Sequence, residues 1–242
     1  MQTLALIRTL TGAELRNIRR DSMLRWMAAF PILFAVLTRW LVPLVDASIE
    51  LDLQPYYLLI ISVTAVMGSP VLIGFLVGVL LLDERDDGTL QAIRVTPLSM
   101  RRYLAWKLSL PVAVTTLLSL LGIPLAGLVS FQFNFTPAVL VGALWAPILA
   151  LAMVAFAKDK LQGFVLMRVT NGLLLLPIGV WFFDARWEPL FAVLPAYWPL
   201  KAFWLAARGE SYLLFAVTGA AYHAAIVAWL YARFQRSLGR ST

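Results

Sequence analysis

Hydrophobic residues fall into six long runs that are separated by short polar or charged stretches. Each run has about 20 residues, the length at which a helix crosses the hydrocarbon core of a bilayer. Because lipid offers the backbone no hydrogen-bond partner, such runs are expected to be helices. We therefore predict an all-α membrane protein with six transmembrane helices, at approximately residues 26–45, 56–82, 103–129, 136–157, 163–183 and 213–234.

Segments outside these runs have patterns of their own. Residues 1–25 are basic and amphipathic, which predicts a cytoplasmic helix lying in the membrane interface; a disordered basic tail is the alternative. Residues 184–212 are too apolar for free solvent and too rich in proline for a span, which predicts short helices dipping into the outer interface. We expect one transmembrane domain over residues 26–234, and a basic cytoplasmic tail at residues 235–242.

The region from Asp83 to Lys107 interrupts the hydrophobic pattern, because nine of its twenty-five residues are charged. A charge at the bilayer centre costs at least about 3 kcal/mol, so this region must lie in water at a membrane face. One apolar run leads directly into this region, and another follows it directly. The sequence therefore predicts a loop of residues 83–102 that is held at the membrane surface by two spans.

Two short helical segments are predicted inside this region. Thr89 is suited to cap the first, and Leu90 and Ile93 share one of its faces because they are three residues apart. A threonine-proline pair at residues 96–97 is expected to end it, and Ser99 is suited to cap the next helix. A helix that exposes apolar side chains in water indicates a docking surface for another protein; an ordinary solvated loop is the alternative.

The distribution of positive charge predicts the orientation. Of the 20 lysines and arginines, all but four lie on the side of the chain termini and of the 83–107 region. Cytoplasmic loops carry the excess of these residues in membrane proteins, which places both termini in the cytoplasm. The same rule accounts for the net charge of +7, so this charge does not indicate that nucleic acid is a partner. The residues on the outer side are Arg39, Arg186, Lys201 and Arg208.

Composition and missing motifs exclude several classes of function. With 61% hydrophobic and 14% charged residues, the chain is far more apolar than a soluble domain. It has no cysteine, which excludes disulfides and thiolate metal sites, and we expect no metal ion in it. It has no GxxxxGK[ST] motif and hence no P-loop, and it has neither HExxH nor GxSxG. We expect no catalytic residue, and no ATP hydrolysis by this chain.

A few polar or small residues inside the spans are candidates for function. Arg168 and Asn171 lie near the start of the fifth run; Arg168 either lines a water-filled path or extends its side chain to the inner interface. His223 lies mid-span, where a path residue and an interhelical hydrogen bond are the alternatives. Gly74 and Gly78 form a GxxxG pair that allows close helix packing, within the chain or at a subunit interface.

The charged region also resembles a known family. Its acidic cluster is followed by Gly-Thr-Leu, by Val-Thr-Pro-Leu-Ser, and by an aromatic residue and a lysine in the next helix. This order is similar to the first cytoplasmic loop of ABC-2 type permeases, and above all to the branch of fluoroquinolone export permeases. The resemblance covers nearly the whole chain and is supported by the stretches GSPVLIGFLVGVLLLDE, FAKDKLQGFVLMR and LPAYWPLKAFW.

The resemblance implies that membrane transport and ATP binding are carried out by different subunits. Permeases of this family are membrane subunits of ATP-driven exporters, and a separate ATPase subunit binds ATP and Mg²⁺. It also implies an N-terminal elbow-like helix, an outer re-entrant segment at residues 184–212, and a second permease subunit, either identical or different. The resemblance assigns contact with the ATPase to the matching loop residues, namely Glu84, Gly88, Thr89, Leu90, Thr96, Pro97 and Ser99. The apolar face of the predicted helix adds Ile93 to this set.

Three functions remain open from the sequence. The first is a permease that exports a hydrophobic or amphipathic substrate, such as a drug or antibiotic, across the cytoplasmic membrane of a prokaryote. The second is a non-transporting membrane partner or sensor that uses the same kind of ATPase. The third, an intramembrane enzyme, finds little support, because the single histidine has no evident carboxylate or serine partner.

Overall fold

The structure is a computed structural model that describes residues 12, 16, 20, 22–49, 52–94, 99–183 and 185–239. Throughout these residues the regular elements are helices, and none is a strand. Six of the helical stretches are long and apolar enough to cross a membrane, which confirms the predicted fold class. These stretches are Ala28–Ser48, Gln54–Asp86, Met100–Ala126, Phe133–Phe156, Lys160–Trp181 and Leu213–Arg236.

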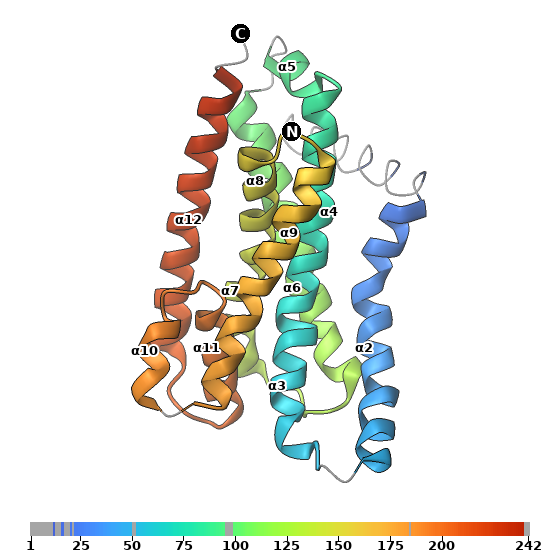
Figure 1. Ribbon diagram of the computed structural model, residues 1–242, viewed down its shortest axis with the longest axis vertical. Coiled ribbons are helices and arrows are strands. Elements are labelled where there is room, and N and C mark those ends of the chain that lie inside the picture. The colour runs from blue at the N-terminus through green and yellow to red at the C-terminus, as the bar shows by residue number, and fades with distance from the viewer. Residues whose placement is uncertain are drawn as a thin grey trace.

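Several of the six spans are built from more than one helical segment, and short helices also lie between them (Figure 1). The elements, in chain order, are α2 (Ser22–Ser48), η1 (Gln54–Tyr56), α3 (Tyr57–Ile61), η2 (Ser62–Met67), α4 (Gly68–Asp86), α5 (Thr89–Arg94), α6 (Met100–Ala126), η3 (Phe133–Phe135), α7 (Thr136–Ala143), α8 (Trp145–Phe156), α9 (Lys160–Leu175), η4 (Leu176–Trp181), η5 (Ala185–Trp187), α10 (Glu188–Phe191), α11 (Tyr197–Ala207) and α12 (Leu213–Gly239).

Helix α4 lies at the centre of the bundle. The apolar window of its span is 89% buried, whereas the corresponding windows of the first and fifth spans are each 17% buried. Its largest contact is with α8, and it also packs against α2, α6 and α9. A change at either end of α4 therefore reaches several other spans directly.

The contact between α4 and α8 depends on two glycines. A Cβ atom on Gly74 would lie 2.8 Å from both the Cα and the carbonyl oxygen of Ala146, which are backbone atoms that cannot move aside. A Cβ atom on Gly78 would overlap the sulfur of Met153. The GxxxG pair therefore lies inside a helix contact of this one chain.

The second span contains a wide turn. Ser62–Met67 forms a π-helical segment immediately before α4, whose third residue is Pro70. Pro70 has no N–H to donate to the carbonyl of Val66, so the regular hydrogen-bond ladder cannot run through this point. Trp204 of α11 donates an indole hydrogen bond of 3.0 Å to the Ser62 hydroxyl, which fixes the wide turn against the neighbouring helix.

Helices α10 and α11 lie at the end of the bundle opposite α5 (Figure 1). Helix α11 is largely buried and packs against α7 and α12, and the ring of its Phe203 lies 4.6 Å from that of Phe135. The segment therefore folds back into the bundle instead of spreading over its surface. Apolar side chains of α11 fill the space between spans, which explains why this stretch is so hydrophobic.

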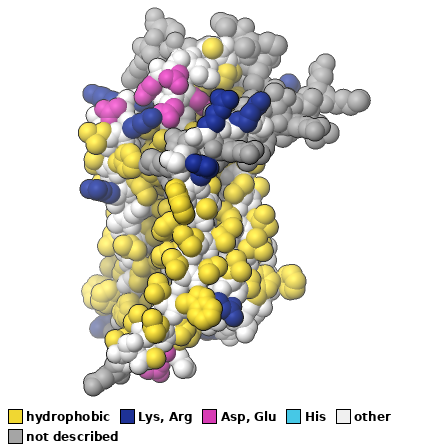
Figure 2. Space-filling model, turned by 90° about the vertical axis from the view of Figure 1, so that its right-hand side faces the viewer, with side chains coloured by type: hydrophobic (Ala, Val, Ile, Leu, Met, Phe, Trp, Pro, Cys, Tyr) yellow, Lys and Arg dark blue, Asp and Glu magenta, His cyan; other side chains and the backbone are white. Residues whose placement is uncertain are grey.

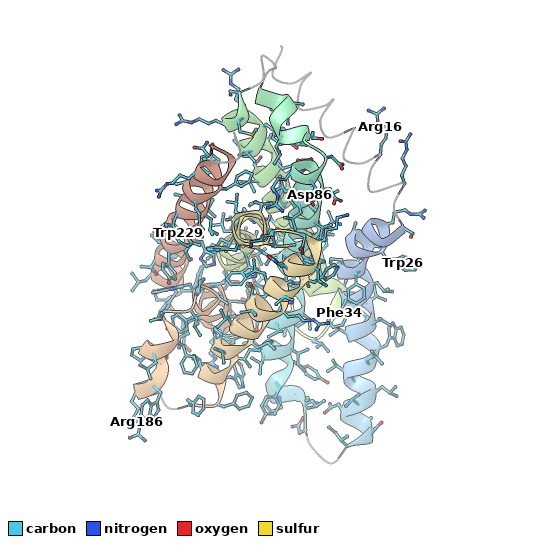
Figure 3. The ribbon with its side chains drawn as sticks, turned by 45° about the horizontal axis from the view of Figure 1, so that its top comes forward. Arg16, Trp26, Phe34, Asp86, Arg186 and Trp229 are labelled. Carbon is cyan, nitrogen blue, oxygen red and sulfur yellow. The ribbon has the colours of Figure 1, made fainter. Side chains whose placement is uncertain are left out.

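Charged side chains gather at the ends of the bundle, and hydrophobic side chains cover the stretch between them (Figure 2). Helix α2 begins and α12 ends at the end where α5 lies (Figure 1). Trp26 on α2 and Trp229 on α12 are exposed and lie on opposite flanks (Figure 3). Most of the predicted interfacial helix at residues 1–25, and residues 240–242 of the predicted tail, lie outside the described residues.

Candidate functional site at the junction of α4 and α5

The end of α4 turns sharply into α5 through a glycine. The N–H of Asp87 donates to the carbonyl of Asp83 (2.8 Å), which closes the last turn of α4. Gly88 follows with a φ of 71°, a left-handed conformation that glycine adopts without strain. The first helical bond of α5 runs from the N–H of Ala92 to the carbonyl of Gly88 (3.0 Å). Gly88, and not Thr89 as predicted, therefore occupies the N-cap position.

The predicted apolar face of α5 is turned inward. Leu90 is only 1% exposed and belongs to the hydrophobic core, and Ile93 is partly buried and packs against that core. The prediction that this pair forms an exposed docking surface is therefore wrong. An amphipathic helix held directly under a bundle buries its apolar face against the nearest span, which here is α4. The exposed residues around this turn are Asp86, Asp87, Thr89 and Ala92.

The next helix begins where the sequence predicts. Ser99 has extended backbone geometry and its hydroxyl accepts a hydrogen bond from the N–H of Arg102 (3.4 Å), so it caps α6. Thr96 and Pro97, which are predicted to end α5 and to take part in docking, lie outside the described residues.

Glu84 joins α4 to α6 by two short contacts. Its Oε1 lies 2.6 Å from the Nζ of Lys107, and its Oε2 accepts a hydrogen bond of 2.5 Å from the Tyr103 hydroxyl. The side chain of Lys107 is 1% exposed and that of Glu84 is 21% exposed. A buried ammonium needs a compensating partner, so this pair strongly constrains how α4 and α6 lie together.

Two neighbours of Glu84 reach other helices. The carboxylate of Asp83 lies 2.6 Å from the Nζ of Lys160 at the start of α9. The guanidinium of Arg85 donates to the carbonyls of Ala157 (2.8 Å) and Lys158 (2.7 Å), just past the end of α8. A positive charge at a helix C-terminus satisfies carbonyls that have no partner within the helix.

Three consecutive residues of α4 thus connect to three different helices, α9, α6 and α8. We call this set the α4 junction, defined by Asp83, Glu84 and Arg85 with their partners. The junction holds no arrangement for acid–base or nucleophilic chemistry, since its carboxylates are engaged by fixed cations. What it provides is a physical connection: the end of α4, which leads directly into α5, contacts α6, α9 and the residues just past α8.

The candidate residues within the spans lie apart from this junction. Arg168 is exposed on the outside of α9, and Asn171 is partly buried with a carbonyl oxygen that has no hydrogen-bond partner among the described residues. His223 is fully buried, and its Nδ1 lies 2.8 Å from the carbonyl of Gly219 in the same helix. Its other ring nitrogen, Nε2, is buried with no hydrogen-bond partner among the described residues, so the interhelical hydrogen bond is not formed there.

Sequence reasoning did not assign a site role to Lys107, Tyr103, Asp83 or Arg85. A signal for two of them was present: Tyr103 and Lys107 are four residues apart, so they share one face of α6. Lys107 also lies three residues after Leu104, on the apolar side of the helix, where a lysine needs an acidic partner. The nearest acidic cluster in the chain lies at the end of α4 and includes Glu84.

Comparison with known proteins decides the family. The family model described as "Fluoroquinolones export permease protein Rv2686c-like" matches residues 14–231. The chain belongs to this family. Two members from Mycobacterium tuberculosis are named fluoroquinolones export permease proteins, Rv2686c from strain ATCC 25618 / H37Rv and MT2760 from strain CDC 1551 / Oshkosh. Each is 33% identical to the chain over 232 residues, covering 92% of this chain and 91% of the relative.

Membership in the export permease family confirms the resemblance on which the sequence interpretation relied. No solved structure matches the chain significantly. With the six spans, membership in this permease family makes the chain a multi-pass membrane protein.

Proposed function

We propose that this chain is the transmembrane subunit of an ATP-driven exporter, and that it moves an amphipathic drug-like molecule out of the cell. The observation that supports this most strongly is its match, over most of its length, to export permeases named for fluoroquinolones. The chain has no P-loop, so the energy comes from a separate ATPase that binds ATP and Mg²⁺.

We place the ATPase on the exposed side of the α4–α5 turn, in contact with Asp86, Asp87, Thr89 and Ala92. Leu90 and Ile93 support this surface from beneath, and the α4 junction supports the turn as a whole. Movement of a docked ATPase would then reach α6, α8 and α9 together through Glu84, Arg85 and Asp83. For Gly88, Thr96, Pro97 and Ser99 we retain the contact with the ATPase that the family resemblance implies.

Orientation follows from the charges. The excess of lysine and arginine on the side of the α4–α5 turn favours the cytoplasm for that end and for both termini. This orientation puts the docking surface where ATP is available. We further propose the cytoplasmic membrane of a prokaryote as the location, and a second permease subunit, identical or different, as the partner that completes the translocation path. Arg168 and Asn171, on the weakly buried α9, are our candidates for lining that path.

Co-purification tests the docking surface directly. Ala92 is exposed, so Ala92→Glu alters the surface without disturbing the core. We expect affinity-purified Ala92→Glu protein to lose most of the ATPase that the wild type retains, while its thermal unfolding stays unchanged. Gln132→Glu is the matched control, because Gln132 is exposed and lies between the last residue of α6 and η3, a whole span away from the start of α6 that follows α5. Equal ATPase recovery from Ala92→Glu and wild type would contradict the proposed docking surface.

Leu90→Asp would not serve for this purpose. Because Leu90 is buried in the core, a carboxylate there is expected to unfold the junction, and loss of the ATPase would then carry no information about docking. Transport itself is tested by reconstituting permease and ATPase into vesicles. ATP-dependent movement of a fluoroquinolone is the expected result. A complex that hydrolyses ATP without moving substrate would instead favour a sensor.

A further inference from the structure

A cleft with charged and aromatic walls lies at the end of the bundle opposite the α4 junction. Its volume is about 520 Å³, and it is wide open on one side, so it would hold part of a ligand rather than enclose it. It is formed by α10, α11 and the beginning of α12, and by the turn between the last two helices. The lining is mixed: Glu188, Lys201 and Glu210 supply charge, while Leu205 and Phe215 are among the apolar residues.

One wall of this cleft is a fixed ion pair. The Nζ of Lys201 lies 2.8 Å from Oε1 of Glu188, and the Tyr197 hydroxyl donates to the same oxygen over 2.6 Å. Both of these contacts are to the same oxygen of the Glu188 carboxylate, Oε1. Lys201 also lies 6.0 Å from the centre of the Phe215 ring. Lys201 and Tyr197 therefore hold Glu188 through one of its two carboxylate oxygens.

The second carboxylate, that of Glu210, is exposed on the rim. Within the described ranges it forms no ion pair, although Arg208 is only two residues away; the Arg208 guanidinium instead lies 5.3 Å from the Trp181 ring. The ionic lining of the cleft thus sums to one negative charge, from two carboxylates and one ammonium. This excess is local, since the chain as a whole carries +7.

We propose that this cleft binds an amphiphile through its protonated amine, with the ammonium group held between Glu210 and Oε2 of Glu188 and the apolar body lying along Phe215 and Leu205. Lys201 remains beside them to receive an anionic group when the amphiphile is a zwitterion. A cationic amine with an apolar body occurs both in amphipathic drugs and in phosphatidylethanolamine, and the chemistry of the cleft fits either source. Its assignment as the outer site of an exporter rests on the function proposed above.

Fluorescence binding to the purified chain in nanodiscs tests this assignment. The probe is a fluorescent fluoroquinolone that carries a piperazine amine, and its N-acetylated derivative lacks the positive charge. We expect Glu210→Gln to weaken binding of the amine about three- to fivefold, as for a solvent-exposed ion pair, and Glu210→Lys to weaken it more. Binding of the N-acetylated derivative is expected to be weak and unchanged by either substitution.

Asp52→Asn is the matched control. Asp52 is also exposed, just before η1 and α3, and α3 lies at the same end of the bundle as α10 and α11 (Figure 1); its substitution removes the same charge without touching the cleft. If Asp52→Asn weakens binding as much as Glu210→Gln, or if Glu210→Gln binds as well as wild type, the site is refuted. Unaltered thermal unfolding of Glu210→Gln is the check that the variant is folded.

Lipid composition separates the two sources. Nanodiscs of phosphatidylglycerol alone are compared with nanodiscs that also contain phosphatidylethanolamine. If phosphatidylethanolamine weakens probe binding to wild type but has no such effect on Glu210→Gln, the lipid amine is an occupant of the cleft. Equal binding in both sets identifies the drug amine as the occupant. Because this assay uses the permease alone, it succeeds or fails independently of ATPase docking.

Discussion

At the α5 end of the bundle, three consecutive residues of α4 reach three different helices, whereas at the opposite end Glu188 and Lys201 pair within a single segment of residues 188–201. The first arrangement ties spans together, whereas at the second end α12 meets the segment of residues 188–201 through aromatic rings such as Trp198 and Phe215 and through the hydrogen bond from the Tyr222 hydroxyl to the Val193 carbonyl. The contrast predicts that the α5 end moves as one unit while the opposite end can open. An exporter driven from one side needs both properties.

The largest expected effect comes from the buried cation of the α4 junction. Lys107→Met leaves the carboxylate of Glu84 without its ammonium partner, so we expect a loss of about 3 kcal/mol in the free energy of unfolding. The double variant Glu84→Leu, Lys107→Met is expected to recover most of the loss, because no buried charge remains. Thermal unfolding in detergent measures both. A single variant as stable as wild type would show that the pair does not hold α4 to α6.

The middle of α4 is expected to be less sensitive than its charged end. Gly74→Ala places a Cβ against backbone atoms of Ala146, so α4 and α8 must separate at a cost of about 1–3 kcal/mol. Gly172→Ala in α9 is the control, since a Cβ there meets nothing within 4 Å. We expect thermal unfolding to shift in the first variant only. Similar behaviour of the two variants would argue against close α4–α8 packing.

The opposite end should respond to pH in a defined direction. Burial raises the pKa of Glu188, but hydrogen bonds from Lys201 and Tyr197 outweigh it and leave the pKa below its ordinary value of 4.5. Because the pKa is lowered, the ionised Glu188 stabilises the folded state fully above pH 4.5. This stabilisation is lost as the pH falls through the lowered pKa.

Melting temperatures of wild type and Glu188→Gln test this pH dependence. The advantage of wild type over the variant should be constant from about pH 7 to pH 5 and should shrink below about pH 4. An advantage that grows on acidification would contradict the assigned ion pair.

The smallest effect is expected at the exposed part of the α4 junction. The ion pair between Asp83 and Lys160 has side chains that are 35% and 53% exposed, so water screens it. Lys160→Gln should therefore cost well under about 1 kcal/mol in the free energy of unfolding. A loss comparable to that of Lys107→Met would mean that the junction depends on its surface charges rather than on its buried pair.

The six spans could be predicted because each depends on local information, namely a run of apolar residues of bilayer length. Ser99 was predictable as a cap for the same reason: its side chain bonds within its own helix turn. The family was predictable from the order of residues around the charged loop. These features need no knowledge of which helices are neighbours.

Most of what the sequence did not reveal concerns how one segment packs against another. Leu90 was expected to be exposed because the pattern marks an apolar face but does not say what covers it; α4 does. Arg85 bonds to Ala157, 72 residues away, and nothing in the local sequence links the two. The lining of the outer cleft likewise depends on how α11 folds back between α7 and α12. Only the three-dimensional arrangement supplies these pairs.

The central claim is that the α4–α5 turn faces the cytoplasm, where an ATPase can reach it. The chain has no cysteine, so single cysteines can be placed without background. Asp86 lies toward the α5 end of the bundle, whereas Arg186 lies at the opposite end (Figure 3). In intact cells, a membrane-impermeant thiol reagent should label Arg186→Cys at once and Asp86→Cys only after the membrane is permeabilised. Labelling of Asp86→Cys from outside intact cells would contradict the account.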